Sequence, residues 1–144
     1  MFVKGSNFMT DVVSCILMDE NGRILILKRS DKVRTYRGCW SSIAGYVEED
    51  EEPLDTAFKE IREEAGLLEG DIVLVRRGDP VEFSDVYEGE IYNWKIFPFL
   101  FKTEKKDKVQ IDWEHTNYRW VYPSDISGFD TVPHFDDVVS NLLI

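Results

Sequence analysis

The sequence predicts an α/β (α+β) protein in which a mixed β-sheet is sandwiched between helices. Segments rich in Val, Ile and aromatic residues lie both before and after a helical stretch at residues 53–66. A second, amphipathic helix is expected over residues 133–143, with Thr131 as its cap. Strands flanking one helix, with a second helix to cover the other face, favour layered packing in a single domain over residues 1–144.

Length and composition are those of a globular protein with a sizeable core. The 144 residues are 43% hydrophobic and 31% charged. No apolar run reaches the roughly 20 residues that a membrane-spanning helix needs, and the N-terminus lacks the pattern of a secretory signal. Cys15 and Cys39 are too few for a disulfide framework, so a cytoplasmic protein is expected, with Cys15 in the core.

The first elements are expected to form a hairpin. Residues 8–18 favour a strand, and residues 23–28 favour a second one that pairs back through an Asn21-Gly22 turn. Asp19, Asn21 and Gly22 could also begin a calcium-binding loop, but the other ligands are missing at the required spacing, so the turn is favoured. A short strand at residues 40–43 follows.

Most of the negative charge lies in one segment, residues 45–69. This segment holds ten acidic and two basic residues, a net charge of −8 out of the −11 of the whole chain. A broad nucleic-acid-binding surface is disfavoured, because neutralising phosphates requires clustered cations.

The helix within this acidic segment carries three glutamates on one side. Its apolar face consists of Leu54, Ala57, Phe58, Ile61 and Ala65. Pro53 suits its first turn, and Gly66 suits its end. Glu60, Glu63 and Glu64 fall in an arc about 100° wide, away from the apolar face. Composition alone favours a solvated face, but three close carboxylates repel one another unless a cation such as Mg²⁺ lies among them.

The spacing favours the metal site. Residues 45–67 match the Nudix box, a motif with many fixed positions across one loop and helix. The matching residues are Gly45, Glu51, Glu60, Ile61, Glu63, Glu64, Gly66 and Leu67. The chain therefore resembles a Nudix hydrolase. The resemblance implies a Nudix-type α/β/α sandwich and Mg²⁺-dependent hydrolysis of a diphosphate bond in a nucleoside diphosphate linked to a moiety X, with Mn²⁺ as an alternative ion.

The resemblance also implies roles for the residues of the box. Glu60, Glu63 and Glu64 would bind the metal and serve catalysis, and the backbone carbonyl of Ala44 would be a further metal ligand. Four other residues would be structural: Gly45, Glu51, Lys59 and Gly66. Lys59 stands where the family has arginine, so the charge is kept but the bidentate guanidinium fork is lost.

A basic segment precedes the box. Residues 28–37 carry five basic residues against Asp31 alone, a net charge of +4, which suits either a solvated loop or the phosphates of a substrate. In Nudix proteins a basic residue near the end of the second strand often faces the substrate. Arg29 matches that position, and Arg37 is a second substrate-binding candidate.

Further strands are expected after the box. Residues 72–77 favour a strand, residues 82–89 a polar loop, and residues 91–101 an apolar strand in which Pro98 implies a bulge or an edge. Four aromatic residues of the last strand could pack in the core or stack on a base. They are Tyr92, Trp94, Phe97 and Phe99.

A possible additional catalytic residue lies near the C-terminal third of the chain. Many Nudix proteins place a further glutamate shortly before a Trp-Val strand, and Glu114 before Trp120-Val121 matches this arrangement. His115 could act as a base, but a lone histidine is more often a hydrogen-bonded structural residue. Glu114 is therefore the preferred candidate.

The substrate remains open at the level of sequence. Pro80 lies near the place where ADP-ribose-hydrolysing relatives have a proline, so ADP-ribose or a similar small nucleoside diphosphate derivative is favoured, with an oxidised-nucleotide triphosphatase as an alternative. A nucleotide-sensing, non-catalytic module is a second alternative. An isopentenyl diphosphate isomerase is a third, disfavoured because Cys39 precedes Trp40. Residues 142–144 could form a homodimer contact or pack into their own core.

Overall fold

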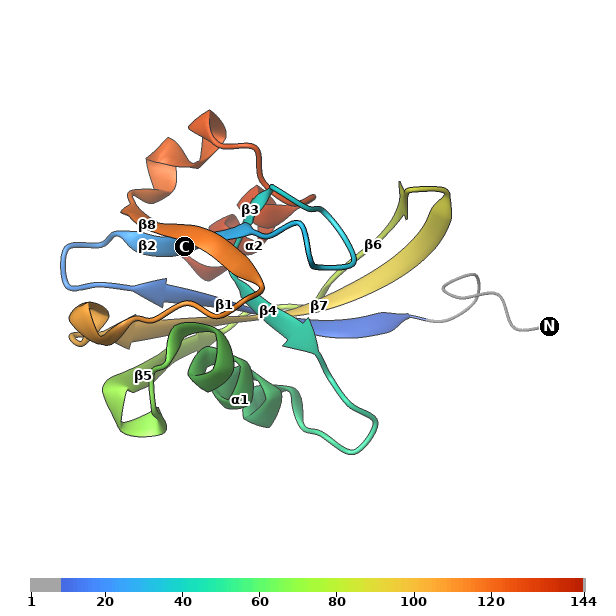
Figure 1. Cartoon of the computed structure of the whole chain (residues 1–144). Helices are drawn as coiled ribbons and strands as arrows, with labels where there is room; N and C mark the ends of the chain where they lie inside the picture. The colour runs from blue at the N-terminus through green and yellow to red at the C-terminus, as the bar shows by residue number, and fades with distance from the viewer. Residues whose placement is uncertain (1–8, 144) are drawn as a thin grey trace.

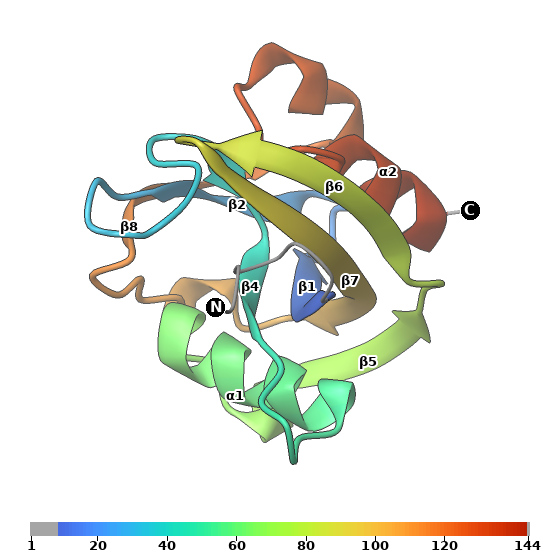
Figure 2. The same cartoon turned by 90° about the vertical axis from the view of Figure 1, so that its right-hand side faces the viewer.

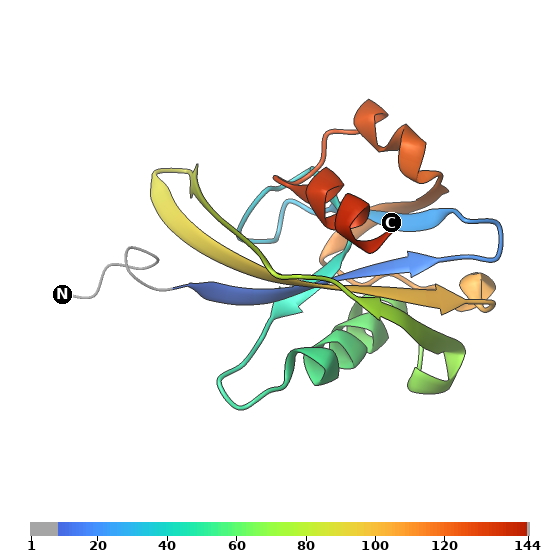
Figure 3. The same cartoon turned by 180° about the vertical axis from the view of Figure 1, so that it is seen from behind.

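The structure, a computed structural model, describes residues 9–143. In this part of the chain eight strands form one mixed sheet, with helices α1 and α2 covering opposite faces (Figures 1 and 3). The strands are β1 (Thr10–Met18), β2 (Ile24–Arg29), β3 (Trp40–Ser41), β4 (Ile43–Tyr46), β5 (Ile72–Arg77), β6 (Val81–Tyr87), β7 (Glu90–Thr103) and β8 (His115–Val121). The helices are α1 (Pro53–Ala65) and α2 (Phe135–Leu142), with 3-10 segments η1 (Glu69–Asp71), η2 (Lys106–Lys108) and η3 (Pro123–Gly128). The predicted sandwich is confirmed.

The sheet is organised around the parallel pair of β1 and β7. Its central order is β3-β2-β1-β7-β5, and β4, β6 and β8 add to β1, β7 and β2. β1 pairs with β2 only where Met18 faces Ile24, and then pairs with β4 along Val12 to Cys15. β1 and β2 therefore diverge beyond this contact. Residues of β1, β3 and β4 line a cavity.

Two apolar clusters hold the layers together. Alternate residues of β1 point to opposite faces, so that Val13, Cys15 and Leu17 pack with α1 while Ile16 packs with α2. Cys15 is thus a core residue, as predicted. Within residues 9–143, no helix has the length and apolar character needed to cross a membrane.

The predicted turn at Asn21-Gly22 is confirmed. Gly22 has a φ of 81°, which favours glycine, and its N–H donates to the carbonyl of Asp19. The buried carboxylate of Asp19 accepts the backbone N–H groups of Asn21 and Arg23 at 2.9 Å each and also faces the ammonium of Lys106 at 3.1 Å. These contacts belong to a tight turn rather than to a calcium loop.

The predicted polar loop at residues 82–89 is wrong, because β6 occupies most of it and pairs with β7. Half-buried residues of β6, among them Val81, Phe83 and Tyr87, alternate with exposed ones. The segment therefore has the two-residue period of a strand, although many of its side chains are polar. The turn comes only at Glu88 and Gly89, whose φ values of 49° and 82° suit a two-residue hairpin.

β7 is an internal strand, so an edge position for Pro98 is also wrong. β6 pairs with β7 up to Ile96, and β5 pairs with it from Phe99 onward. Pro98 lies between these partners, where its carbonyl accepts the N–H of Gly78 at 2.9 Å. The missing N–H of proline therefore falls at a break in the ladder.

The C-terminal helix is shorter than predicted. α2 begins at Phe135 with His134 as its N-cap, and Thr131 instead forms an isolated bridge with Trp40. Leu142 is fully buried, and Leu143 packs against the same cluster, so both belong to the chain's own core. Residues 8 and 144 lie outside the described residues.

Candidate active site

Glu64 is buried, although its helical position predicts an outward direction. Its side chain is 2% exposed, with Oε1 3.4 Å from the N–H of Ala44 and 3.7 Å from Nε2 of His115. Oε2 has no hydrogen-bond partner among the described residues. Burial raises the pKa of Glu64, and the neighbouring carboxylates of Glu60 and Glu114 raise it further. A buried carboxylate oxygen without a donor suits a cation ligand.

Glu60 lies against β4 at Gly45. A Cβ on Gly45 would come within 2.7 Å of Glu60 Oε1 and closer still to its Cδ, so only glycine leaves room for this carboxylate. Burial raises the pKa of Glu60. Glu63, by contrast, is exposed to solvent and lies at the rim of the cavity. Ala44 lines the same cavity beside them.

These residues suit a divalent cation by their chemistry. Hard cations prefer carboxylate and carbonyl oxygens, and these are the groups that Glu60, Glu63, Glu64 and the Ala44 backbone offer. Within residues 9–143 no three acidic, histidine or cysteine side chains converge closely enough to form a ready ligand set. The charge of Glu60 raises the pKa of Glu64, and a cation among these carboxylates would relieve that repulsion.

Glu51 and Lys59 fix the acidic loop on the helix. Lys59 Nζ lies 2.7 Å from Glu51 Oε2, while Glu51 Oε1 accepts the hydroxyl of Thr56 at 2.9 Å and the N–H of Glu48 at 3.0 Å. These donors lower the pKa of Glu51 to about 2, the Lys59 hydrogen bond most of all. Gly66 ends α1 with a φ of 73°. These contacts join the loop to α1, and the structural roles of Glu51, Lys59 and Gly66 stay a prediction.

Glu114 and His115 reach the site from the start of β8. Glu114 lines the cavity with Glu60 and Glu63, and burial raises its pKa, followed by the charge of Asp112. His115 lies between Asp112, 3.3 Å from Nδ1, and Glu64. Burial lowers the pKa of His115, which favours the uncharged imidazole.

Arg29 closes the same end of the cavity. Its Nε donates to the carbonyl of Thr35 at 2.9 Å, which fixes the guanidinium. Burial lowers its pKa, while the nearby Glu64 and Glu114 act in the opposite direction. A half-buried guanidinium facing acidic groups is suited to bind phosphate.

Arg37 lies in a different place. Its guanidinium forms an ion pair with Glu88 at 2.8 Å, and its backbone N–H donates to the hydroxyl of Tyr87 at 3.3 Å. Tyr36 beside it donates its hydroxyl to Asp85 at 2.7 Å. These contacts attach the β2–β3 loop to the β6–β7 hairpin, which curves toward it in Figure 2.

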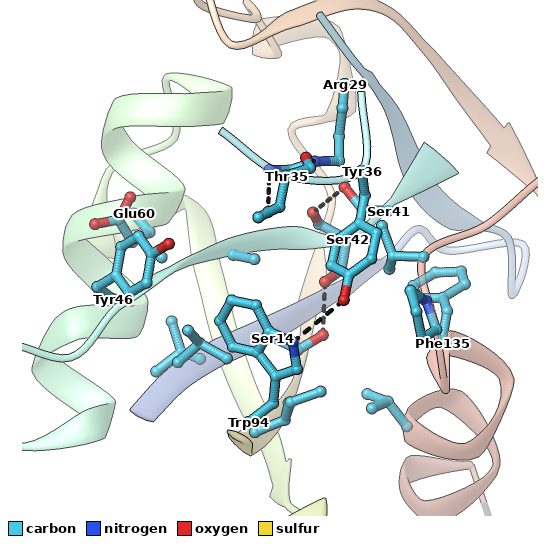
Figure 4. Close-up of a pocket in the computed structure, with 18 of the residues that line it drawn as sticks. Ser14, Arg29, Thr35, Tyr36, Ser41, Ser42, Tyr46, Glu60, Trp94 and Phe135 are labelled. Atoms are coloured by element: carbon cyan, nitrogen blue, oxygen red, sulfur yellow. Dashed lines mark hydrogen bonds between the residues drawn. The ribbon is translucent and has the colours of Figure 1, made fainter. Parts of the chain in front are cut away.

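The cavity has a volume of about 360 Å³, within the range of small-molecule sites. The acidic end carries Arg29 and four glutamates, Glu48, Glu60, Glu63 and Glu114, and the aromatic end includes Tyr36, Phe83, Trp94 and Phe135. Figure 4 shows Glu60 beside α1 and Phe135 beside α2, on opposite sides of the cavity. Of the four aromatics predicted on β7, only Trp94 lines it. Tyr92 stacks on Trp94 with ring centroids 5.1 Å apart, whereas Phe97 and Phe99 belong to the α1 side of the core.

Sequence reasoning missed Tyr36 as a cavity residue. It has a left-handed φ of 51°, uncommon for an aromatic residue, and its hydroxyl accepts the indole N–H of Trp94 at 3.2 Å. No sequence signal marks this conformation. The hydroxyls of Ser14 and Ser42, 2.6 Å apart, were missed as well because each resembles an ordinary strand residue.

The chain matches the profile of the NUDIX domain over residues 9–142. It belongs to the Nudix family. A relative named nucleoside triphosphatase NudI, from Escherichia fergusonii, is 26% identical over 125 residues, which is 82% of this chain and 86% of the relative. The structure of a MutT protein from Methanosarcina mazei has a TM-score of 0.74 at 26% identity, covering 94% of this chain and 93% of that one. An Ap4A hydrolase of C. elegans has a TM-score of 0.75 at 18% identity, covering 92% and 94%.

These comparisons confirm the predicted Nudix fold, family and enzyme class, a pyrophosphohydrolase. The isomerase alternative depended on Cys39, and Cys39 is not among the residues that line the cavity described above.

Proposed function

We propose that this Nudix hydrolase cleaves the diphosphate bond of a nucleoside diphosphate linked to a moiety X, with a divalent cation at the box glutamates. The observation that carries the proposal is one cavity with two unlike ends. Its acidic end, with Arg29, suits a cation and phosphates, and its aromatic end suits a base. The bound nucleoside would lie against Trp94 and Tyr36, with the diphosphate beside Arg29.

The residues of the site would have separate roles in binding the cation and the substrate. Glu60, Glu63 and Glu64, with the Ala44 carbonyl, would hold Mg²⁺ or Mn²⁺, which when bound offsets phosphate charge and lowers the pKa of water. Glu51 and Lys59 anchor the loop that precedes α1 to the helix that carries the three glutamates. Arg29 binds and orients the diphosphate.

The step is a hydrolysis. A water oxygen forms the new bond to phosphorus, the bridging P–O bond breaks, and the proton of the water passes to a carboxylate. Glu60, Glu64 and Glu114 are the candidates for this base. Glu114 differs from the other two because it lines the cavity without being assigned to the cation, so its carboxylate is available to a water.

The substrate class can be determined by assaying hydrolysis over a panel of nucleotides. The relative named nucleoside triphosphatase favours nucleoside triphosphates beside ADP-ribose. We expect one of these to be hydrolysed with Mg²⁺ and not with EDTA, with kcat reduced by about 10²-fold or more in Glu64→Gln. Release of nucleoside monophosphate is the readout, and Glu69→Gln, at an exposed residue outside the cavity, is the control. Binding without turnover of any diphosphate at saturating Mg²⁺ would refute the proposal.

A further inference from the structure

A second cavity, of about 530 Å³, adjoins the first. Four residues line both cavities: Arg29, Thr35, Tyr46 and Glu114. The cavities therefore meet at Arg29, which is assigned to the diphosphate, and at Glu114, which is assigned to the water. The other lining residues of the second cavity, called the basic cavity below, are Asp31, Lys32, Val33, Arg34, Arg37 and Trp113.

Three of its six unshared residues are cationic. Lys32 and Arg34 are exposed and form no ion pair within residues 9–143, whereas Arg37 is paired with Glu88. Asp31 is the acidic residue among them. In a chain with a net charge of −11, such a concentration of positive charge beside the active site favours an anionic ligand.

The position of the basic cavity limits what that ligand can be. With the base at Trp94 and the diphosphate at Arg29, the part of the substrate beyond the scissile bond must extend past Glu114. The basic cavity lies there, because Glu114 and Arg29 line both cavities. Trp113, 63% exposed, forms an aromatic wall of this space.

Resting on the proposed function, we propose that Lys32 and Arg34 bind a phosphate-terminated moiety X, so that the preferred substrate is a nucleoside triphosphate cleaved to a monophosphate and pyrophosphate. A terminal phosphate carries up to two charges that a neutral sugar lacks. The two flexible cations would therefore favour the triphosphate over a nucleoside diphosphate sugar.

The test compares two variants that lose the same charges. Lys32→Ala/Arg34→Ala alters the basic cavity, and Lys102→Ala/Arg119→Ala removes one exposed lysine and one exposed arginine that line neither cavity. We expect the first variant to lower kcat/KM for nucleoside triphosphates by about 10-fold or more, while kcat/KM for ADP-ribose changes by less than about 3-fold. The control should match the wild type on both substrates. Calorimetry with inorganic pyrophosphate in metal-free buffer should show weaker binding to the first variant alone.

Two outcomes would overturn the inference. An equal loss on triphosphates and ADP-ribose would mean a general electrostatic field rather than a subsite. Unchanged triphosphate kinetics, with Trp113→Ala impairing only dinucleoside polyphosphates, would mean that the cavity takes a second base. If the wild type hydrolyses none of these substrates, the proposed function fails, but pyrophosphate calorimetry still decides the basic cavity: weaker binding in the first variant supports it, and equal binding in both variants overturns it.

Discussion

The close approach of Glu60 to Gly45 leads to a sharp prediction for Gly45→Ala. The added Cβ would lie within 2.7 Å of Glu60 Oε1, whereas ordinary contacts are 3.4 Å or longer, so the carboxylate must move by on the order of 1 Å. Misplacing a catalytic group by this distance costs about 10²-fold in rate. Gly45 has no left-handed φ, and the group displaced is the end of a flexible side chain, so the free energy of unfolding should change by less than about 2 kcal/mol.

Steady-state kinetics and urea unfolding measure these two quantities separately. Gly128→Ala is the matched control, because a Cβ at Gly128 meets nothing within 4 Å. If the effect passes through Glu60, Gly45→Ala should add little to the loss already caused by Glu60→Gln. A folded Gly45→Ala protein with wild-type kcat would refute this account, as would full additivity of the two losses.

Two further predictions concern the carboxylates of the box. Burial and the neighbouring Glu60 carboxylate raise the pKa of Glu64, so between the ordinary and the raised pKa the metal-free folded protein binds a proton that the unfolded chain has lost. That contribution to stability is present below the ordinary carboxyl pKa and declines as pH rises toward the raised pKa. Urea unfolding of Glu64→Gln at several pH values should show that this decline is gone. An unchanged pH dependence of the free energy of unfolding in the variant would contradict the prediction. Glu51 has its pKa lowered to about 2, chiefly by Lys59, so its contribution is present above the ordinary carboxyl pKa and is lost as pH falls toward 2. Lys59→Met should raise this pKa in an NMR titration, and Lys59→Arg should leave it low; equal titration of Glu51 in both variants would speak against the pair.

Local patterns in the sequence carried most of the secondary structure. β1, β2 and α1 follow from apolar periodicity with a turn or a stop signal at Gly22 and Gly66, all of which are properties of neighbouring residues. β6 was missed because Glu82 and Ser84, two of its three outward residues, are polar and because its partner, the 14-residue β7, lies across a hairpin. Its role as a strand depends on that partner.

The candidate site was predictable only where it is local. The box glutamates belong to one loop and helix, yet the burial of Glu64 comes from β4 and from His115, which is 51 positions away in the chain. The aromatic end is assembled from separate segments around Tyr36 and Trp94. Arg37 has the charge expected of a phosphate ligand, but its ion pair depends on the β6–β7 hairpin, which the sequence reasoning did not predict.

The lysine at position 59 shows how a departure from the family motif can be accommodated locally. An arginine fork could contact both oxygens of a carboxylate, whereas an ammonium is a point donor. In this chain Lys59 contacts only Oε2 of Glu51, and Thr56 and the backbone of Glu48 donate to Oε1. Both oxygens are therefore satisfied without the guanidinium. Because Thr56 is fully buried on α1, its hydroxyl is held as firmly as the helix, and the loop that precedes the glutamates stays anchored to them.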